Sequence, residues 1–463
     1  MIADQDSTGD ARFIRYWGFL GVVTVLLLAF ITPPFQVPDE AQHFFRAYQL
    51  SEGQFISEVR GATAGGQLPS SLQELSEHFL GTRKLHADRP IRPFPIGGTL
   101  AQLDRPLDID KREFVVLTGA AAYGPLAYAP QILAIKMARM SNASVLTTFF
   151  LSRIANGLCA LVLLGWAIWL MPLGRELIAF AALLPMAVYL YASASPDAMI
   201  VSSAFLYTSL ILNRTATNTW SHRDTALAVA TGATFCMIKP VYAPLLLLGF
   251  VQVFYTRHRL VALLTHGGIL VAACALTLLW GLYAASAIIP MPEGVSFAGQ
   301  VEYILRDPLH YGVTLARSLL WRDFYYMQVI GTLGWLTFQL PAVAYWLPAL
   351  AAVLALGSER NQWSRQSMAF VAAGLTITTV CVVLIMTALY VYWTPVGNVV
   401  VEGVQGRYFL PLLPLGVVTL LLAGRHRLWW NKSAARAAIL GLIALEAGIT
   451  IYTVSTTYQV IQG

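Results

Sequence analysis

Charged side chains are scarce in this sequence. Asp, Glu, Lys and Arg make up 12% of the 463 residues, against about 25% in a typical soluble domain. The four cysteines stand singly in apolar runs, without Cys-x-x-Cys spacing, which argues against a disulfide framework or a zinc site. Basic blocks that bind nucleic acid are also missing, so no nucleic-acid partner is expected. With 57% hydrophobic residues, the composition indicates a protein that crosses the membrane several times.

Apolar runs close to the length of a bilayer-crossing helix recur along the chain. The alternation of a membrane β-barrel is absent. We therefore predict an all-α integral membrane protein with about 11 transmembrane helices, within a range of roughly 10 to 13. The predicted spans are 16–31, 146–171, 177–193, 197–212, 225–238, 241–255, 261–284, 334–357, 367–390, 407–424 and 437–456.

The basic residues indicate how the chain is oriented. Arg12 and Arg15 precede the first span and place the N-terminus in the cytoplasm. Residues 123–140 are interpreted as a re-entrant or interfacial helix, because the later short basic loops then all face the cytoplasm. Whether this segment crosses the membrane stays open. The chain 1–463 is then one transmembrane domain, with a first external loop at 33–145, containing juxtamembrane helices, and a second at 285–330.

The stretch that follows the first span has a helical pattern with two unlike faces. If the helix begins at Pro38, then Asp39, His43 and Arg46 fall within an arc of about 60°. The opposite side is apolar enough to lie on a bilayer or a core. Such a polar face is either simply solvated or functional. We favour the functional interpretation, because the helix emerges directly from a membrane span.

Five ionisable residues lie at the outer ends of predicted spans, each near a Pro or Gly: Asp39, Glu40, Asp197, Lys239 and Arg407. Ionisable groups near membrane depth are costly and usually functional. Snorkelling or an interhelical pair remains the alternative for Asp197 and Lys239. Together, the carboxylates suit a general base for a hydroxyl, and the cations suit a departing phosphate. A substrate with a phosphate at the surface and a tail in the bilayer is a lipid-linked sugar.

Several motifs carry a resemblance over nearly the whole chain. They are Pro38-Asp39-Glu40 with His43 and Arg46-Ala47, then Ser195-Pro196-Asp197, Lys239-Pro240-Val241-Tyr242, and Gln405-Gly406-Arg407-Tyr408-Phe409. These motifs resemble a bacterial membrane-protein family of unassigned function, which is itself similar to the GT-C superfamily of glycosyltransferases. Many GT-C enzymes have a His-Pro-Pro-type motif where this chain reads Tyr123-Gly124-Pro125-Leu126. The chain therefore has no histidine at this place.

The resemblance implies an inverting glycosyltransferase in the bacterial inner membrane, with its active site on the external, periplasmic face. It would move a sugar from a polyprenyl-phosphate donor to a hydroxyl of an envelope glycan or lipid. Asp39 would be the catalytic base, with Glu40 as a close second. The expected substrate-binding residues are His43, Arg46, Tyr123, Asp197, Lys239, Tyr242, Gln405, Arg407 and Tyr408. No cofactor is expected to be required, although Asp39, Glu40 and Asp197 offer oxygen ligands for Mg²⁺ or Mn²⁺.

Other functions stay open at this point. A flippase or transporter for lipid-linked glycans needs charged residues along the middle of its spans. An O-antigen-type polymerase or ligase needs similar external arginines, and a non-catalytic scaffold needs none of these side chains. The sequence does not specify the sugar, the acceptor, the polyprenol or the oligomeric state.

Overall fold

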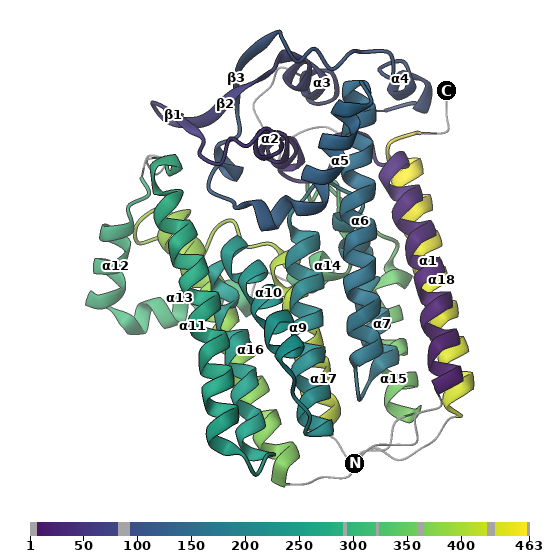
Figure 1. Cartoon of the computed structure of the whole chain (residues 1–463), viewed down its shortest axis with the longest axis vertical. Coiled ribbons are helices and arrows are strands. Elements are labelled where there is room, and N and C mark those ends of the chain that lie inside the picture. Colours follow the sequence, from purple (N-terminus) through teal and green to yellow (C-terminus); the bar gives the residue numbers. More distant parts are fainter. Residues whose placement is uncertain are drawn as a thin grey trace.

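The computed structural model describes residues 7–81, 93–289, 294–320, 324–358, 365–423 and 431–460, and most of them are helical. Parts of both predicted external loops, at 82–92, 290–293 and 321–323, lie outside the described residues. The expectation of a mostly helical membrane protein is confirmed at this level. Figure 1 shows a bundle of long helices with a separate layer over one end.

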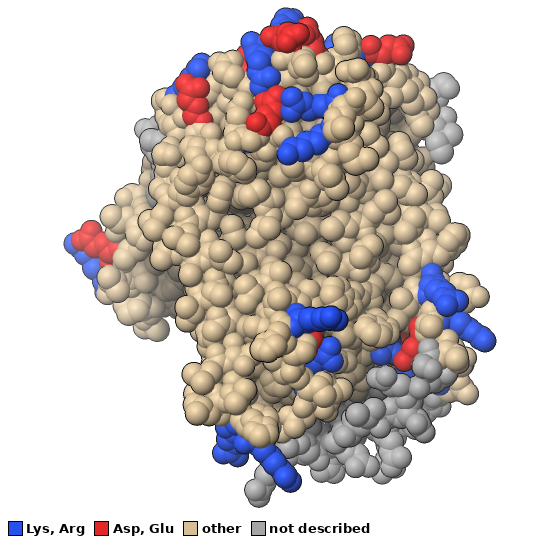
Figure 2. Space-filling view, in the orientation of Figure 1, with Lys and Arg blue, Asp and Glu red and all other residues tan. Residues whose placement is uncertain are grey.

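Among the described residues, six helical segments are long and apolar enough to cross a membrane. They are α1 (Ser7–Ile31), α6 (Val145–Leu170), α11 (Arg259–Tyr283), α16 (Arg365–Tyr392), η6 (Gly406–Leu412) continuing into α17 (Leu413–Ala423), and α18 (Lys432–Thr457). Their axes run along the length of the molecule (Figure 1). Charged side chains on the face drawn in Figure 2 gather toward the two ends and on one flank, which leaves an uncharged belt between them. An apolar belt of this kind suits a bilayer.

The remaining predicted spans are shorter, interrupted or less apolar. They correspond to α7 (Arg175–Ala182) with α8 (Pro185–Tyr191), α9 (Asp197–Thr217), α10 (His222–Ile238), the 3₁₀ helix η3 (Pro240–Phe254), and α15 (Leu347–Ser358). Helix α8 begins at Pro185, and η3 contains Pro244. Both prolines interrupt regular α-helix, because proline lacks the N–H that a continuous α-helix needs. A small hairpin, β4 (Thr332–Leu333) with β5 (Phe338–Gln339), overlaps the start of the predicted span 334–357, which then reaches α15 through η5 (Ala342–Tyr345). Eleven spans are therefore not established.

A layer that we call the cap, residues 33–140, covers one end of the bundle (Figure 1). It contains α2 (Glu40–Ser51), β1 (Glu58–Arg60), β2 (Thr63–Pro69), α3 (Ser70–Leu80), α4 (Ile96–Leu100), β3 (Arg112–Val116), η1 (Thr118–Ala120), η2 (Pro125–Tyr128) and α5 (Ala129–Met140). The strands form an antiparallel sheet in the order β1-β2-β3. Arg60 pairs with Thr63 across a two-residue turn in which Gly61 has a φ of 59°. This sheet was not expected, because glycines interrupt the alternation of its central strand.

The second predicted loop is also helical. It contains η4 (Ala285–Ala287), α12 (Phe297–Arg306), α13 (Pro308–Leu320) and α14 (Phe324–Gly331). Helices α12 and α13 lie at one flank of the bundle in Figure 1.

Ion pairs fasten the end of the bundle away from the cap. Arg436 of α18 contacts Asp10 of α1, and its Nε donates to Glu176 Oε1 of α7 at 2.7 Å. Arg175 also contacts Asp10. Side chains from three helices therefore share one buried network, which fixes α1 and α18 beside each other.

Candidate functional site

Four charged residues from distant parts of the chain meet beneath the cap. Asp39 precedes α2, Asp197 is the first residue of α9, Lys239 precedes η3, and Arg407 is the second residue of η6. Each is next to a Pro or Gly, which stops the preceding segment and starts the next helix. The local sequence thus places all four at helix starts, and the bundle brings those starts together. We call these four residues the charge cluster.

The charge cluster alternates in sign. Arg407 Nη2 donates to Asp39 Oδ2 at 2.9 Å, and Arg407 Nη1 lies 3.4 Å from Asp197 Oδ2. Lys239 Nζ donates to the other oxygen, Asp197 Oδ1, at 2.8 Å. The side chain of Asp39 is 46% exposed, whereas that of Arg407 is only 4% exposed. Asp39 is therefore the open member of a cluster whose centre is buried.

Arg407 retains hydrogen-bonding capacity at this centre. Within the described part of the chain, its Nε and Nη1 atoms are buried without a hydrogen-bond partner, as is Gln405 Oε1. Buried donors without partners cost about 1–3 kcal/mol each. Such a guanidinium is suited to an anionic ligand with several acceptor oxygens.

Tyr408 lies against both cations. Its ring centroid is 4.4 Å from Lys239 Nζ and 5.5 Å from the central carbon of the Arg407 guanidinium. Its carbonyl accepts a hydrogen bond of 2.7 Å from the Tyr242 hydroxyl, which is buried. Tyr242 therefore fixes the backbone that positions Arg407 and Tyr408.

The backbone at Asp39 adopts a left-handed conformation, with φ of 64° and ψ of 3°. Phe35, four residues earlier, also has a φ of 64°. Non-glycine residues in such regions cost on the order of 1–3 kcal/mol and persist only where the surroundings enforce them. The turn that carries Asp39 must therefore be held by other contacts.

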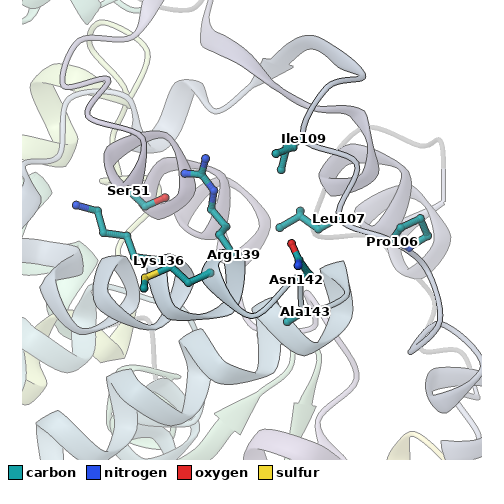
Figure 3. Close-up of a pocket in the computed structure, with 9 residues that line it drawn as sticks. Ser51, Pro106, Leu107, Ile109, Lys136, Arg139, Asn142 and Ala143 are labelled. Atoms are coloured by element: carbon teal, nitrogen blue, oxygen red, sulfur yellow. The ribbon is translucent and has the colours of Figure 1, made fainter.

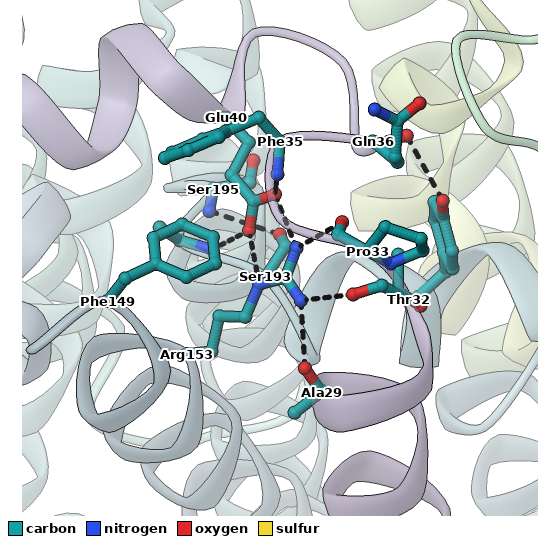
Figure 4. A network of polar contacts seen from close by, with 12 residues as sticks. Ala29, Thr32, Pro33, Phe35, Gln36, Glu40, Phe149, Arg153, Ser193 and Ser195 are labelled. Carbon is teal, nitrogen blue, oxygen red and sulfur yellow. Dashed lines mark hydrogen bonds and ion pairs between the residues drawn. The ribbon is translucent and has the colours of Figure 1, made fainter. Parts of the chain in front are cut away.

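Glu40 supplies part of that support (Figure 4). Its carboxylate accepts two hydrogen bonds from Arg153, at 2.8 and 2.7 Å, and both side chains are completely buried. The same carboxylate accepts the backbone N–H of Phe35 at 3.0 Å and that of Ala194 at 2.9 Å. Glu40 therefore binds the turn to α6 and to the segment before α9, and its ion pair is with Arg153 and not with the charge cluster's cations.

Arg153 completes the support from the other side. Its guanidinium donates to the carbonyls of Ala29, Thr32 and Pro33, at 2.8, 2.7 and 3.1 Å. The Ala29 carbonyl has no helical partner, because residue 33 is proline and lacks an N–H. Arg153 thus satisfies the end of α1 and anchors the turn that leads to Asp39.

His43 lies beside the charge cluster and is neutral at pH 7. Its Nδ1 is 2.8 Å from the hydroxyl of Tyr128, and its ring stacks on Tyr123 with centroids 5.7 Å apart. Burial lowers the pKa of His43 to about 4, because Asp39 and Asp197 only partly offset the desolvation while Arg407 and Lys239 add to it. A neutral imidazole between aromatic rings orients neighbours and does not add a charge.

Arg46 is buried away from the charge cluster's ion pairs. It donates to the Tyr123 carbonyl from two nitrogens, at 3.1 and 3.0 Å, and to the Phe55 carbonyl at 2.8 Å. The expected grouping of Asp39, His43 and Arg46 is formed only in part. His43 lies beside Asp39, whereas Arg46 bonds to the cap, and Asp39 precedes the helix in the left-handed region. Arg46 instead holds the Tyr123 segment against α2.

The three proposed cation ligands do not share one site. Glu40 belongs to the Arg153 network, while Arg407 separates Asp39 from Asp197. In the described ranges, no group of three or more His, Cys, Asp or Glu side chains is arranged to hold a metal ion. Arg407 and Lys239 are the cations that contact the carboxylates of Asp39 and Asp197 in the described part of the chain.

The expected residues thus fall into two groups. Those at or beside the charge cluster are Asp39, Asp197, Lys239, Arg407, Tyr408, His43, Tyr123, Tyr242 and Gln405, whereas Glu40 and Arg46 support the turn and the cap. Two further residues, Arg153 and Tyr128, are not predicted from the sequence to belong to this region. Arg153 carried a usable signal, because it is an ionisable residue inside a predicted span. Tyr128 carried none.

Comparison with known families gives a match over most of the chain. Residues 22–416 match the family described as "Predicted membrane protein (DUF2142)", and this range contains all four members of the charge cluster. No curated protein and no solved structure matches significantly. The matched range covers most of the chain, which therefore belongs to the DUF2142 family of predicted membrane proteins.

Proposed function

We propose that this protein is an inverting glycosyltransferase of the GT-C type, which uses a polyprenyl-phosphate sugar and acts at the periplasmic face of the bacterial inner membrane. The observation that carries the proposal is the buried Arg407 guanidinium, which lies between two carboxylates and whose Nε and Nη1 atoms have no hydrogen-bond partner in the described part of the chain. An anionic leaving group needs such donors, and an acceptor hydroxyl needs such a base. The sugar acceptor would be an envelope glycan or lipid.

The resting ion pair between Asp39 and Arg407 supports the following order of events. The donor phosphate takes the donors of Arg407 and Lys239, and this releases Asp39 from its 2.9 Å contact. Asp39 then accepts the proton of the acceptor hydroxyl, whose oxygen attacks the anomeric carbon. The bond between that carbon and the phosphate oxygen breaks, and the polyprenyl phosphate leaves against Arg407 and Lys239. One displacement of this kind inverts the anomeric centre.

The other residues position these groups. Asp197 fixes Lys239 and Arg407 through contacts of 2.8 and 3.4 Å. Tyr408 covers both cations, and the aromatic pair His43–Tyr123 forms a wall next to them on which a sugar ring can stack. Because two side-chain cations supply the positive charge, we expect transfer to continue in the presence of EDTA.

The test compares wild type with Asp39→Asn in membranes, following label from a mixed pool of polyprenyl-phosphate sugars into envelope glycan. Loss of a general base lowers the rate by about 10²–10⁴-fold. The matched control is Asp110→Asn, an exposed carboxylate on the same cap. Equal transfer by wild type and Asp39→Asn refutes the assignment of the base.

A second readout follows the phosphate without requiring the correct sugar. Undecaprenyl phosphate should raise the thermal midpoint of the wild-type protein in detergent, and Arg407→Gln should abolish that rise. If both proteins respond equally, the charge cluster does not bind the donor phosphate.

One observation favours a transporter. Glu446 lies in the middle of α18, is 2% exposed, and both of its carboxylate oxygens lack a hydrogen-bond partner in the described part of the chain. Ionisable groups inside spans often mark ion or substrate paths. Translocation of a lipid-linked glycan that is lost in Glu446→Gln but retained in Asp39→Asn would favour this second function.

A further inference from the structure

A pocket opens on the cap, and none of its lining residues belongs to the charge cluster (Figure 3). Its volume is about 580 Å³, and it lies between the C-terminal ends of α2 and α5 and the segment 106–109. Figure 3 shows Arg139 extending from α5 toward the space in front of Ile109, with Leu107 and Asn142 across from it. The pocket therefore combines cationic and apolar walls.

The cationic wall has more positive than negative charge. Arg139 Nη2 lies 3.5 Å from Glu52 Oε1, but Arg112 binds that same carboxylate through two nitrogens, at 3.1 and 2.5 Å. Lys136 has no acidic partner among the described residues. Arg139 and Arg112 thus share one carboxylate, and Lys136 is in addition to them. Because the Arg139 guanidinium also lies 5.5 Å from the ring centroid of Tyr48, it is held in place at the pocket.

The outer side of α5 is apolar. Leu133, Met137 and Met140 are 62%, 62% and 86% exposed and recur at i, i+4 and i+7, so they form one stripe. An exposed apolar stripe beside basic residues is typical of a helix that lies at the boundary between lipid headgroups and acyl chains. Lys136, next to Met137, is then at headgroup level.

We propose that this pocket binds the phosphate of an anionic phospholipid. Arg139 grips the phosphate with its planar fork, Lys136 adds a point charge, and the acyl chains lie along the Leu133–Met137–Met140 stripe. A zwitterionic lipid carries a cationic headgroup as well, which the net positive wall disfavours.

The position of the pocket links it to the cluster through two helices. Helix α2 begins directly after Asp39 of the charge cluster and ends with Ser51 at the pocket. Helix α5 begins directly after Tyr128, the partner of His43, and reaches Arg139. Each helix has 12 residues and is therefore about 18 Å long. A phospholipid in the pocket clamps the far ends of both helices. This inference concerns binding, and it does not depend on the proposed glycosyl transfer.

The experiment uses the full-length protein in a non-ionic detergent, with short-chain phosphatidylglycerol titrated against short-chain phosphatidylcholine. Native mass spectrometry counts the bound lipids, and the thermal midpoint reports stabilisation. We expect phosphatidylglycerol to bind and to raise the midpoint. The double variant Lys136→Gln/Arg139→Gln should weaken binding by at least about tenfold, because each basic side chain near a lipid surface contributes about a factor of five.

The matched control is Arg60→Gln/Lys111→Gln, which removes the same charge from exposed positions elsewhere on the cap. Unchanged lipid binding in this control, together with loss in the pocket variant, supports the proposal. Equal weakening in both variants shows general charge attraction and overturns it. Glycerol 3-phosphate, titrated alone, separates the two sources of phosphate: stabilisation by it as strong as that by the lipid overturns the lipid assignment.

Discussion

Replacing Glu40 by glutamine should destabilise the fold strongly, although the change is isosteric. Each carboxylate oxygen accepts two hydrogen bonds: Oε1 from Arg153 and the N–H of Ala194, and Oε2 from Arg153 and the N–H of Phe35. A glutamine amide must place its NH₂ group against one of these pairs of donors, whichever way it is turned. In addition, Arg153 becomes an unpaired charge at a site where both side chains are completely buried.

The expected loss is about 3–5 kcal/mol, the range for breaking a buried ion pair from one side. It should appear as a fall of several degrees in the thermal midpoint, followed by tryptophan fluorescence of the protein in detergent. Apolar replacement of both partners, Glu40→Leu/Arg153→Met, should not restore stability. That double variant leaves the two N–H groups and the carbonyls of Ala29, Thr32 and Pro33 without these partners.

The control for this experiment is Glu58→Gln, which removes the carboxylate of the exposed pair with Arg60. Its midpoint should match that of the wild type, because exposed pairs contribute little. A Glu40→Gln protein as stable as Glu58→Gln would refute the reasoning that the buried network holds the Asp39 turn.

Three further predictions concern pH, packing and the end of the bundle opposite the cap. The pKa of His43 is about 4 in the folded protein and about 6.5 when unfolded, so its contribution to stability is complete above pH 6.5. This contribution, about 3 kcal/mol, is lost as the pH falls from about 6.5 toward about 4. The thermal midpoint of the wild type should therefore fall more over this pH range than that of His43→Gln, and equal slopes of midpoint against pH contradict the assignment. Gly157→Ala should lower the thermal midpoint, because the new Cβ would lie 2.4 Å from Val25 Cγ1 and 2.8 Å from the Tyr191 carbonyl oxygen. The control Gly267→Ala should leave the midpoint unchanged, because a Cβ added there has no heavy-atom neighbour within 4 Å. Arg436→Gln should loosen the buried network of α1, α7 and α18 and increase proteolysis at that end, and an unchanged digestion pattern contradicts this expectation.

The members of the charge cluster could be predicted from the sequence because each combines two signals. Asp197, Lys239 and Arg407 are ionisable residues at the ends of apolar runs, and each lies next to a proline or glycine. Both signals are local, so they survive uncertainty about the number of spans. Their pairing is not local: Arg407 is 368 residues from Asp39, and only the packed bundle determines which carboxylate it contacts.

Glu40 shows where local reasoning is insufficient. It is adjacent to Asp39 in the sequence. A helical wheel cannot separate the roles of these two residues, because the left-handed backbone at Asp39 changes the direction of its side chain relative to that of Glu40. Its partner Arg153 is 113 residues away in α6. The cap sheet was equally inaccessible, since β2 contains Gly65 and Gly66, and its pairing with β3 joins segments about 50 residues apart.

The separation between Asp39 and Arg407 has a consequence for biogenesis. A ribosome adds about 5–20 residues per second, so the 368 residues between these partners take roughly 20–70 s to synthesise. During that interval the Asp39 carboxylate has been delivered to its side of the membrane without the guanidinium that will pair with it. Any chaperone or insertase that holds the Asp39 turn must release it only after η6 has been synthesised. A ribosome that stalls before η6 leaves a chain that contains Asp39 and Asp197 but lacks Arg407.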